Sequence, residues 1–121
     1  MADLVVTLTG DKEDSTHVTI GFTMANKALE KGYNVDMILF SKSVFLAEKE
    51  YADKINIGEP FDPLNELLSN FITGGGTLKV CKGCMVSNNV KEENLIDKAV
   101  VIGAGDVIDT IMSAKKSLQF N

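Results

Sequence analysis

Short apolar runs rich in β-branched residues alternate with helical patterns along the whole chain. Five runs predict strands, at residues 4–9, 34–40, 77–81, 100–104 and 117–120, the last as an edge strand. Strands that alternate with helices are typical of a parallel sheet, because each parallel connection needs a crossover that covers one face. The sequence therefore predicts an α/β fold over residues 1–121. It is a single doubly wound, mostly parallel sheet of four or five strands with helices on both faces and flavodoxin-like layering.

The segments between the strands carry helix signals. Helices are predicted at residues 15–31, 43–52, 63–73, 82–86, 91–99 and 105–116. Ser15 or Thr16 can cap the first helix, and Gly32 ends it, since glycine readily adopts the left-handed backbone that follows a helix. Both prolines fall in residues 55–63, which predict an irregular loop before the third helix.

The first predicted helix is apolar on more than one side. Its apolar positions are Val18, Ile20, Phe22, Met24, Ala25, Ala28 and Leu29. A helix that is apolar on several sides is buried on several sides. In a domain of 121 residues this favours a contact between subunits, so we expect a homo-oligomer.

Composition narrows the classes of partner. The chain has 17 acidic and 12 basic residues, a net charge of −5 and a pI of about 4.8, so a nucleic-acid backbone would be repelled. No window approaches the roughly 18 apolar residues of a membrane span. The opening MADLVVTLTG lacks the basic and long apolar regions of a secretory signal. We expect a cytoplasmic protein without nucleic-acid or membrane partners, in which thiols stay reduced unless they are catalytic, sensing or metal-bound.

Two cysteines stand in the run CKGC after the third predicted strand, and the chain has no others. In a parallel α/β sheet, reactive groups gather beyond the carboxyl ends of the strands. Cys81 ends a strand and therefore lies on this rim, and Cys84 follows one helical turn later. Ser41 and His17 follow other strands onto the same rim. Ser41 is a candidate binding residue, and His17 could transfer protons, since histidine titrates near neutrality.

The surroundings of Cys81 in the sequence favour a reactive thiol. If residues 82–86 form a helical turn, Cys81 stands at its N-terminus, where free N–H groups and the helix dipole favour a thiolate. Lys79 and Lys82 flank it and act in the same direction. A thiolate is the attacking species in sulfur transfer and in disulfide exchange. We therefore predict catalysis at Cys81, with Cys84 as a resolving or supporting thiol and the two lysines as binding residues.

Other interpretations of the cysteines stay open. Free cysteines often only pack. A structural zinc site needs about four ligands, so two cysteines and a single histidine would require a site shared between subunits. A thioredoxin-like motif normally stands near the start of a β-α-β pattern, whereas CKGC follows the third predicted strand. No metal is expected, because the sequence shows no clustered metal ligands. No cofactor is expected either: residues 7–16 faintly resemble a flavodoxin phosphate loop, but they carry three acidic residues and one lysine, and this charge opposes a phosphate group.

The runs LKVCKGCMVSNNV at 78–90, ENLID at 93–97, FTMANKALEKGYNVDMILF at 22–40 and SLQF at 117–120 together resemble the DsrE/DsrF-like sulfur-relay family, which includes the TusD-type subunits. The resemblance implies a small α/β subunit that assembles into trimers or hexamers. It also implies a cysteine that accepts a sulfane sulfur as a persulfide and passes it on. Cys81 matches that cysteine, and Cys84 matches only members with a C-x-x-C. Many members have Gly-Val where this chain has Asn89-Val90; asparagine also adopts left-handed backbone, so the turn is expected to survive.

Three functions follow as predictions. The first is a small sulfur carrier or sulfurtransferase, which takes sulfur from a thiol-bearing donor protein and passes it to a thiol-bearing acceptor protein. The second is an oligomeric binding or scaffold module of the same fold without catalysis, in which the cysteines pack and do not react. The third is a dithiol redox protein in which Cys81 and Cys84 cycle through a disulfide, provided that their geometry allows the bond.

Overall fold

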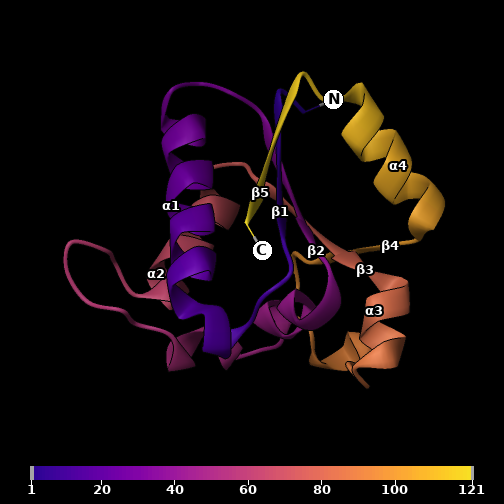
Figure 1. The fold of residues 1–121 in the computed structure, drawn as a ribbon, viewed down its shortest axis with the longest axis horizontal. Coiled ribbons are helices and arrows are strands. Elements are labelled where there is room, and N and C mark those ends of the chain that lie inside the picture. The colour runs from indigo at the N-terminus through magenta and orange to yellow at the C-terminus, as the bar shows by residue number, and fades with distance from the viewer. Residues whose placement is uncertain (1, 121) are drawn as a thin grey trace.

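Five parallel strands form one sheet in the computed structural model, which describes residues 2–120 (Figure 1). The strands are β1 (Leu4–Leu8), β2 (Val35–Leu39), β3 (Thr77–Cys81), β4 (Val100–Ile102) and β5 (Lys116–Phe120). Their spatial order is β4-β3-β2-β1-β5, and every neighbouring pair is parallel. The predicted fold is confirmed, including the C-terminal edge strand, whose position beside β1 the sequence did not indicate.

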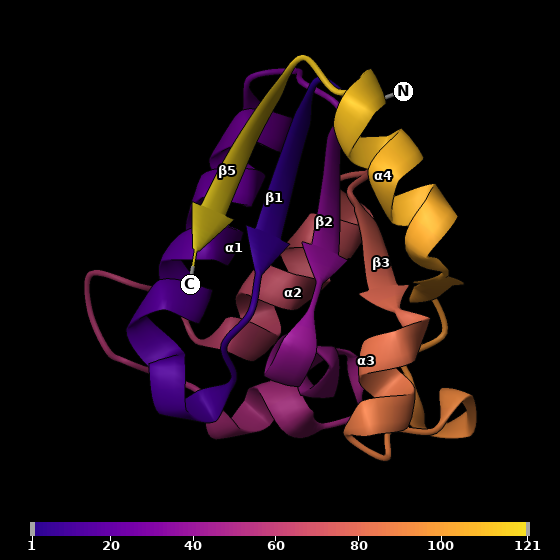
Figure 2. The same cartoon turned by 45° about the vertical axis from the view of Figure 1, so that its right-hand side comes forward.

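Helices cover both faces of the sheet. The helices α1 (Ser15–Glu30) and α2 (Leu64–Thr73) pack together on one face, and α4 (Ala104–Ser113) covers part of the other (Figures 1 and 2). Alternate strand residues serve the two faces. Val6 and Leu8 of β1 join the core beneath α1 and α2, whereas Val5 of β1 and Ile38 of β2 join a smaller cluster beneath α4.

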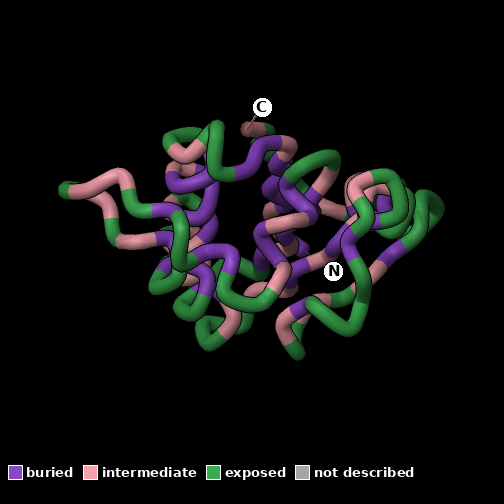
Figure 3. Tube along the Cα trace, turned by 90° about the horizontal axis from the view of Figure 1, so that it is seen from below, coloured by how far each residue is buried: buried purple, intermediate pink, exposed green. Residues whose placement is uncertain are grey.

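The larger core lies between the sheet and the helices α1 and α2. Phe22 of α1 and Phe71 of α2 meet edge to face with ring centroids 6.0 Å apart, and both are fully buried. Gly76 lies so close to the Phe71 ring that an added Cβ would come within 2.3 Å of it. Figure 3 shows the chain from below, with buried positions along the central segments and exposed positions on the outer turns.

Two predicted helices are replaced by shorter turns. The segment 43–52 forms two 3-10 helices, η2 (Ser41–Ala47) and η3 (Tyr51–Lys54), which are separated at Glu50, where φ is +68°. The segment 91–99 contains only η4 (Glu92–Asn94). Glu48 and Leu95 pair there as an antiparallel bridge, and Ile96 N–H bonds the carbonyl of Ala47. This long-range pairing takes the backbone groups that a continuous helix in either segment would have used.

The connections bring four segments to the carboxyl edge of the sheet. They are η1 (Lys12–Asp14) with the start of α1, η2 after β2, α3 (Lys82–Ser87) after β3, and the start of α4 after β4. β1 through β4 step across the sheet in one direction, and the connection through α4 returns the chain to the far side of β1. Across residues 2–120, no helix has the length and apolar character that crossing a membrane requires.

Candidate functional site

Cys81 is the last residue of β3 and immediately precedes α3. Its pairing with Ile102 of β4 fixes its backbone at the carboxyl edge of the sheet. The side chain is partly exposed and outside any disulfide. The predicted helical turn after Cys81 is confirmed, and Cys81 occupies the capping position without making a side-chain capping hydrogen bond to the described chain. The N–H groups of the first turn of α3 therefore lie next to a partly exposed thiol.

Cys84 lies within α3 and packs partly against the main core. Burial raises the pKa of the Cys84 thiol, and its side-chain contact with Cys81 raises this pKa further. The backbone N–H of Ser41 acts in the opposite direction on the same pKa, because it donates toward the Cys84 sulfur. Cys84 is thus a thiol that holds its proton more firmly than an ordinary cysteine, beside the Cys81 sulfur.

Ser41 reaches this site from the end of β2. It adopts left-handed backbone with φ +52°, which aims its N–H at the Cys84 sulfur and its carbonyl oxygen at the Asn88 side chain. Asn88 Nδ2 also donates to the carbonyl oxygen of Cys84 at 2.9 Å. Asn89 is left-handed with φ +58°, as expected for the turn after α3. Sequence reasoning named Ser41 but missed Asn88, whose signal is an asparagine at the end of a short helix.

Both predicted lysines have anionic partners. Lys79 Nζ lies 3.0 Å from Asp36 Oδ2 and 3.0 Å from Thr110 Oγ1, on the sheet face that α4 covers. Lys82 Nζ lies 3.6 Å from Glu92 Oε1, and both side chains are largely exposed. Lys79 thus joins strands β2 and β3 to α4, and its positive charge is matched by that of Asp36. The support that either lysine gives to a thiolate at Cys81 is correspondingly reduced.

His17 is exposed in the first turn of α1 and lies apart from the cysteines. It lines a small cavity of about 290 Å³ with Glu13, Asp14, Ser15 and Thr16. α1 follows β1 and α3 follows β3, with β2 between the two strands. Figure 2 shows the start of α1 and helix α3 at opposite sides of the lower edge. The structure therefore brings Ser41, Cys81 and Cys84 together but leaves His17 outside this group.

A buried polar group at the end of β1 was not predicted. Asp11 is buried, and its carboxylate accepts from Tyr51 Oη at 3.4 Å and from the backbone N–H of Glu13 at 3.2 Å. The Ser43 hydroxyl donates to the carbonyl oxygen of Gly10. Burial raises the pKa of Tyr51, and the nearby Asp11 carboxylate raises it further. In the sequence, Asp11 is only one of three acidic residues in a predicted polar loop.

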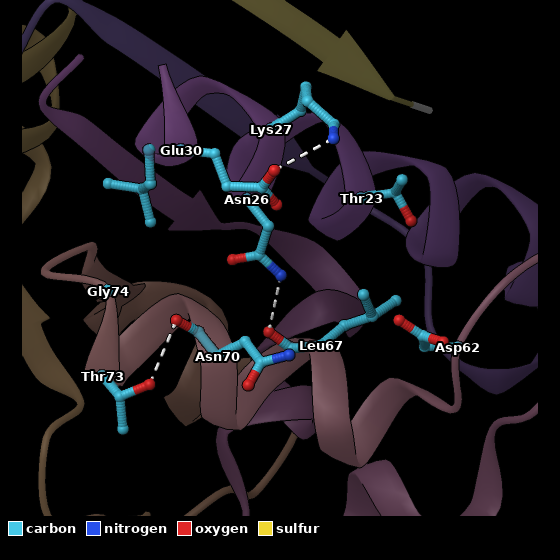
Figure 4. A pocket seen from close by; sticks show the side chains of 10 residues that line it. Thr23, Asn26, Lys27, Glu30, Asp62, Leu67, Asn70, Thr73 and Gly74 are labelled. Atoms are coloured by element: carbon cyan, nitrogen blue, oxygen red, sulfur yellow. Dashed lines mark hydrogen bonds and ion pairs between the residues drawn. The ribbon is translucent and has the colours of Figure 1, made fainter. Parts of the chain in front are cut away.

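A cavity between two helices lies away from the cysteines. Its volume is about 490 Å³, and it opens between α1 and α2 (Figure 4). Asn26 Nδ2 donates to the carbonyl oxygen of Leu67 at 3.0 Å across it, and the Lys27–Glu30 ion pair stands at its rim. Residues 2–120 hold no group of three or more histidine, cysteine, aspartate or glutamate side chains placed to bind a metal ion.

Comparison with known proteins identifies a family match and several proteins that are similar to this chain. The model of the DsrE/DsrF-like family matches residues 2–120. MJ0989, an uncharacterized protein of Methanocaldococcus jannaschii, is 33% identical over 93 residues, which are 77% of each chain. The ychN protein of E. coli aligns with a TM-score of 0.78 and 18% identity, covering 99% of this chain and 100% of that one. MTH1491 of Methanobacterium thermoautotrophicum, described as of unknown function, aligns at 0.68 and 12% identity, covering 93% and 96%. The chain belongs to the DsrE/DsrF-like family.

Proposed function

We propose that this protein is a sulfur carrier that holds a sulfane sulfur as a persulfide on Cys81. The observation that carries the proposal is the position of Cys81, a partly exposed thiol at the carboxyl end of β3 with Cys84 beside it. The parallel sheet supports it, since such sheets place their chemistry at this edge. Membership of the DsrE/DsrF-like family supports a role related to sulfur relay.

Loading and unloading are two thiol exchanges. The Cys81 thiolate attacks the outer sulfur of a donor persulfide; a new S–S bond forms on Cys81, and the donor thiolate leaves. An acceptor thiolate then attacks the outer sulfur on Cys81, takes it as its own persulfide and releases the Cys81 thiolate. No electrons are lost or gained overall, so the cycle needs neither a redox cofactor nor a metal.

Cys84 offers a competing route. Its thiolate can attack the inner sulfur of the Cys81 persulfide, which forms a Cys81–Cys84 disulfide and expels hydrosulfide. The raised pKa of Cys84 disfavours this route at neutral pH, because the thiol form is a poor nucleophile. Cys84 is therefore a supporting thiol near neutrality, and its resolving activity increases as the pH rises.

Intact-mass spectrometry after incubation with cysteine persulfide tests the proposal. Wild type should gain one sulfur, Cys81→Ser should gain none, and Cys84→Ser should gain one and keep it longer, above all at alkaline pH. If the wild type stays unmodified with cysteine persulfide and with thiosulfate, or if Cys81→Ser loads equally well, the proposal is wrong.

The contact between Cys81 and Cys84 favours a dithiol redox protein as a second candidate. That function requires a reversible intramolecular disulfide, whose formation removes two electrons and two protons. Equilibration with mixtures of reduced and oxidized glutathione, followed by trapping of free thiols, would reveal it. A two-electron transition in the wild type without any persulfide loading would favour this candidate over the sulfur carrier.

The proposal includes the cellular setting. The protein acts in the cytoplasm as a homo-oligomer, a trimer or hexamer, with thiol-bearing proteins as donor and acceptor. Ile108 and Met112 support self-association, because they are exposed apolar side chains on neighbouring turns of α4, with 58% and 77% of their surface accessible. Val100 of the edge strand β4 is exposed as well.

A further inference from the structure

A mostly apolar cleft of about 440 Å³ lies between α1 and the amino ends of β1 and β5. Its apolar lining residues are Leu4, Met24, Ala28, Tyr33 and Leu118, of which Met24, Tyr33 and Leu118 are notably exposed. Cys81 stands at the carboxyl end of β3, whereas the cleft lies at the amino ends of the strands, so the cleft and the thiols are at opposite ends of the sheet. The sulfur-carrier proposal does not involve this cleft.

Lysines surround the cleft. Lys27, Lys31, Lys115 and Lys116 line it, a third of the lysines in a chain whose net charge is −5. Asp3, the one acidic lining residue, is paired with Lys115 at 3.2 Å. Lys27 is paired with Glu30. Lys31 and Lys116 form no ion pair with any residue of the described chain, so two positive charges beside an apolar surface are left for a partner.

The outer edge of β5 adjoins this cleft. Among the described strands, β5 pairs with β1 alone. Lys116 N–H bonds the carbonyl of Asp3, and the carbonyl of Phe120 accepts from Thr9 N–H. Because backbone groups alternate in direction along a strand, the N–H and C=O groups of Ser117 and Gln119 point away from β1. Figure 2 shows β5 as the outermost strand, with its far side uncovered by another strand.

We propose that this edge binds an acidic, strand-forming segment of a partner protein. The segment adds to β5 through the outward backbone groups of Ser117 and Gln119, in the manner of strand addition to a free sheet edge. Alternate side chains of an added strand face α1. An apolar side chain at a central position enters the cleft beside Leu118, and carboxylates two residues before and after it reach Lys31 and Lys116.

The charges argue against a second copy as the occupant. In a symmetric contact the same surface patch is contributed by both subunits. Two copies joined at β5 would bring eight cleft lysines to one interface, of which only half have acidic partners within their own chain. An acidic segment instead supplies the charges that Lys31 and Lys116 lack.

Fluorescence anisotropy with labelled peptides tests the proposal on the full chain. The probe is a nine-residue peptide with glutamate, leucine and glutamate at alternating central positions, separated by threonines. Wild type should bind it, with affinity that falls as salt rises. A peptide with lysines in place of the glutamates, and one with serine in place of the leucine, should each bind at least tenfold more weakly.

Matched variants locate the binding site. Lys31→Glu with Lys116→Glu should weaken binding at least tenfold, whereas Lys42→Glu with Lys91→Glu, the same charge change at exposed positions outside the cleft, should change it less than twofold. Gln119→Pro removes an outward N–H and leaves the bonds to β1 in place, so binding should fall at least fivefold. Gln119→Ala keeps that N–H and should bind as wild type does.

Several results would overturn the proposal. They are failure of wild type to bind the acidic peptide, equal binding of the basic peptide, and equal losses in the two lysine pairs. If Lys31→Glu with Lys116→Glu changes the mass by light scattering while no peptide binds, the occupant is a second copy instead. Persulfide loading of Cys81 is measured on Lys31→Glu with Lys116→Glu; because the cleft is remote from Cys81, loading should be unchanged, which separates this result from the sulfur-carrier test.

Discussion

The side-chain amide of Asn88 donates to the carbonyl oxygen of Ser41 at 3.3 Å, although 47 positions separate the two residues in the chain. The same amide bonds the carbonyl oxygen of Cys84 within α3. Asn88 therefore fastens α3, which carries Cys84, to the turn that follows β2. Ser41 in turn aims its N–H at the Cys84 sulfur, so the two contacts together fix the position of the second thiol.

Replacing Asn88 should loosen this connection. Asn88→Ala removes both side-chain hydrogen bonds, and we expect the free energy of unfolding to fall by about 1–2 kcal/mol. Cys84 should also react faster with a thiol reagent in the native protein, because weaker burial exposes the sulfur and favours the thiolate; loss of the Ser41 N–H acts in the opposite direction on the pKa but is the smaller effect. Urea unfolding and thiol titration measure the two effects. Ser87→Ala, an exposed neighbour in the same helix, is the control and should change neither.

The rate at which Cys84 is alkylated should rise at higher pH than for an ordinary cysteine, because its pKa is raised. In Cys81→Ser, where Cys84 is the remaining thiol, the rate of reaction with iodoacetamide should rise with an inflection above the ordinary thiol pKa of 9.0, because burial disfavours the thiolate. The shift should be smaller than in wild type, since the contact with Cys81 is gone. An unfolded control in urea should show the ordinary pKa. An inflection at or below that control value would contradict the assignment.

Replacing Lys79 should lower the free energy of unfolding but leave persulfide loading of Cys81 unchanged. Lys79→Met leaves the Asp36 carboxylate, which is 18% exposed, without its cation, and we expect a loss of about 1–3 kcal/mol. Because the Lys79 charge is already matched by Asp36 and bonded to Thr110, persulfide loading of Cys81 should stay within twofold of wild type. Lys82→Met is the matched variant, and it should cost less than about 1 kcal/mol because its ion pair is exposed. A tenfold loss of loading in Lys79→Met would show that this lysine assists the thiolate directly.

The sequence predicted the sheet well because its strands are continuous apolar runs, as in sheets covered on both faces. It also located Cys81, because the residue after such a strand lies at the carboxyl edge in any parallel arrangement. The strand order was not predictable, since crossover connections of similar length allow β5 to pair on either side. The prediction of helices at 43–52 and 91–99 was wrong because Glu48 and Leu95 pair with each other. Local helix propensity carries no information about a partner 47 residues away.

The composition of the site was harder to predict than its place. Ser41 contacts Cys84 because β2 and β3 are neighbours in the sheet, a relationship that depends on strand order. Asp11 belongs to a segment that the sequence predicts as a polar loop, yet it is 7% exposed and accepts a hydrogen bond from Tyr51. No periodicity marks such a residue, since its hydrogen-bond partner Tyr51 lies 40 positions away in the chain.

Self-association should depend on the exposed apolar side of α4. Ile108→Lys with Met112→Lys places two charges on a surface that is apolar in the wild type, so an oligomer that buries this surface should dissociate. Light scattering coupled to gel filtration at micromolar concentration measures the mass. Asp109→Lys, an exposed position on the same helix, is the control. A monomeric wild type, or a double variant that keeps the wild-type mass, would contradict this expectation.

Tyr51 should control stability at alkaline pH. At neutral pH, Tyr51→Phe loses the hydrogen bond to Asp11, and we expect a cost of about 0.5–1.5 kcal/mol. The pKa of Tyr51 is raised above 10.0, first by burial and then by Asp11, so the unfolded chain releases this proton at lower pH than the folded one. The contribution of Tyr51 is therefore complete below the unfolded pKa and is lost as pH rises through the folded pKa. Urea unfolding from pH 8 upward should show wild-type stability falling more steeply than that of Tyr51→Phe above about pH 10, and parallel curves would show that the phenol titrates without coupling to folding.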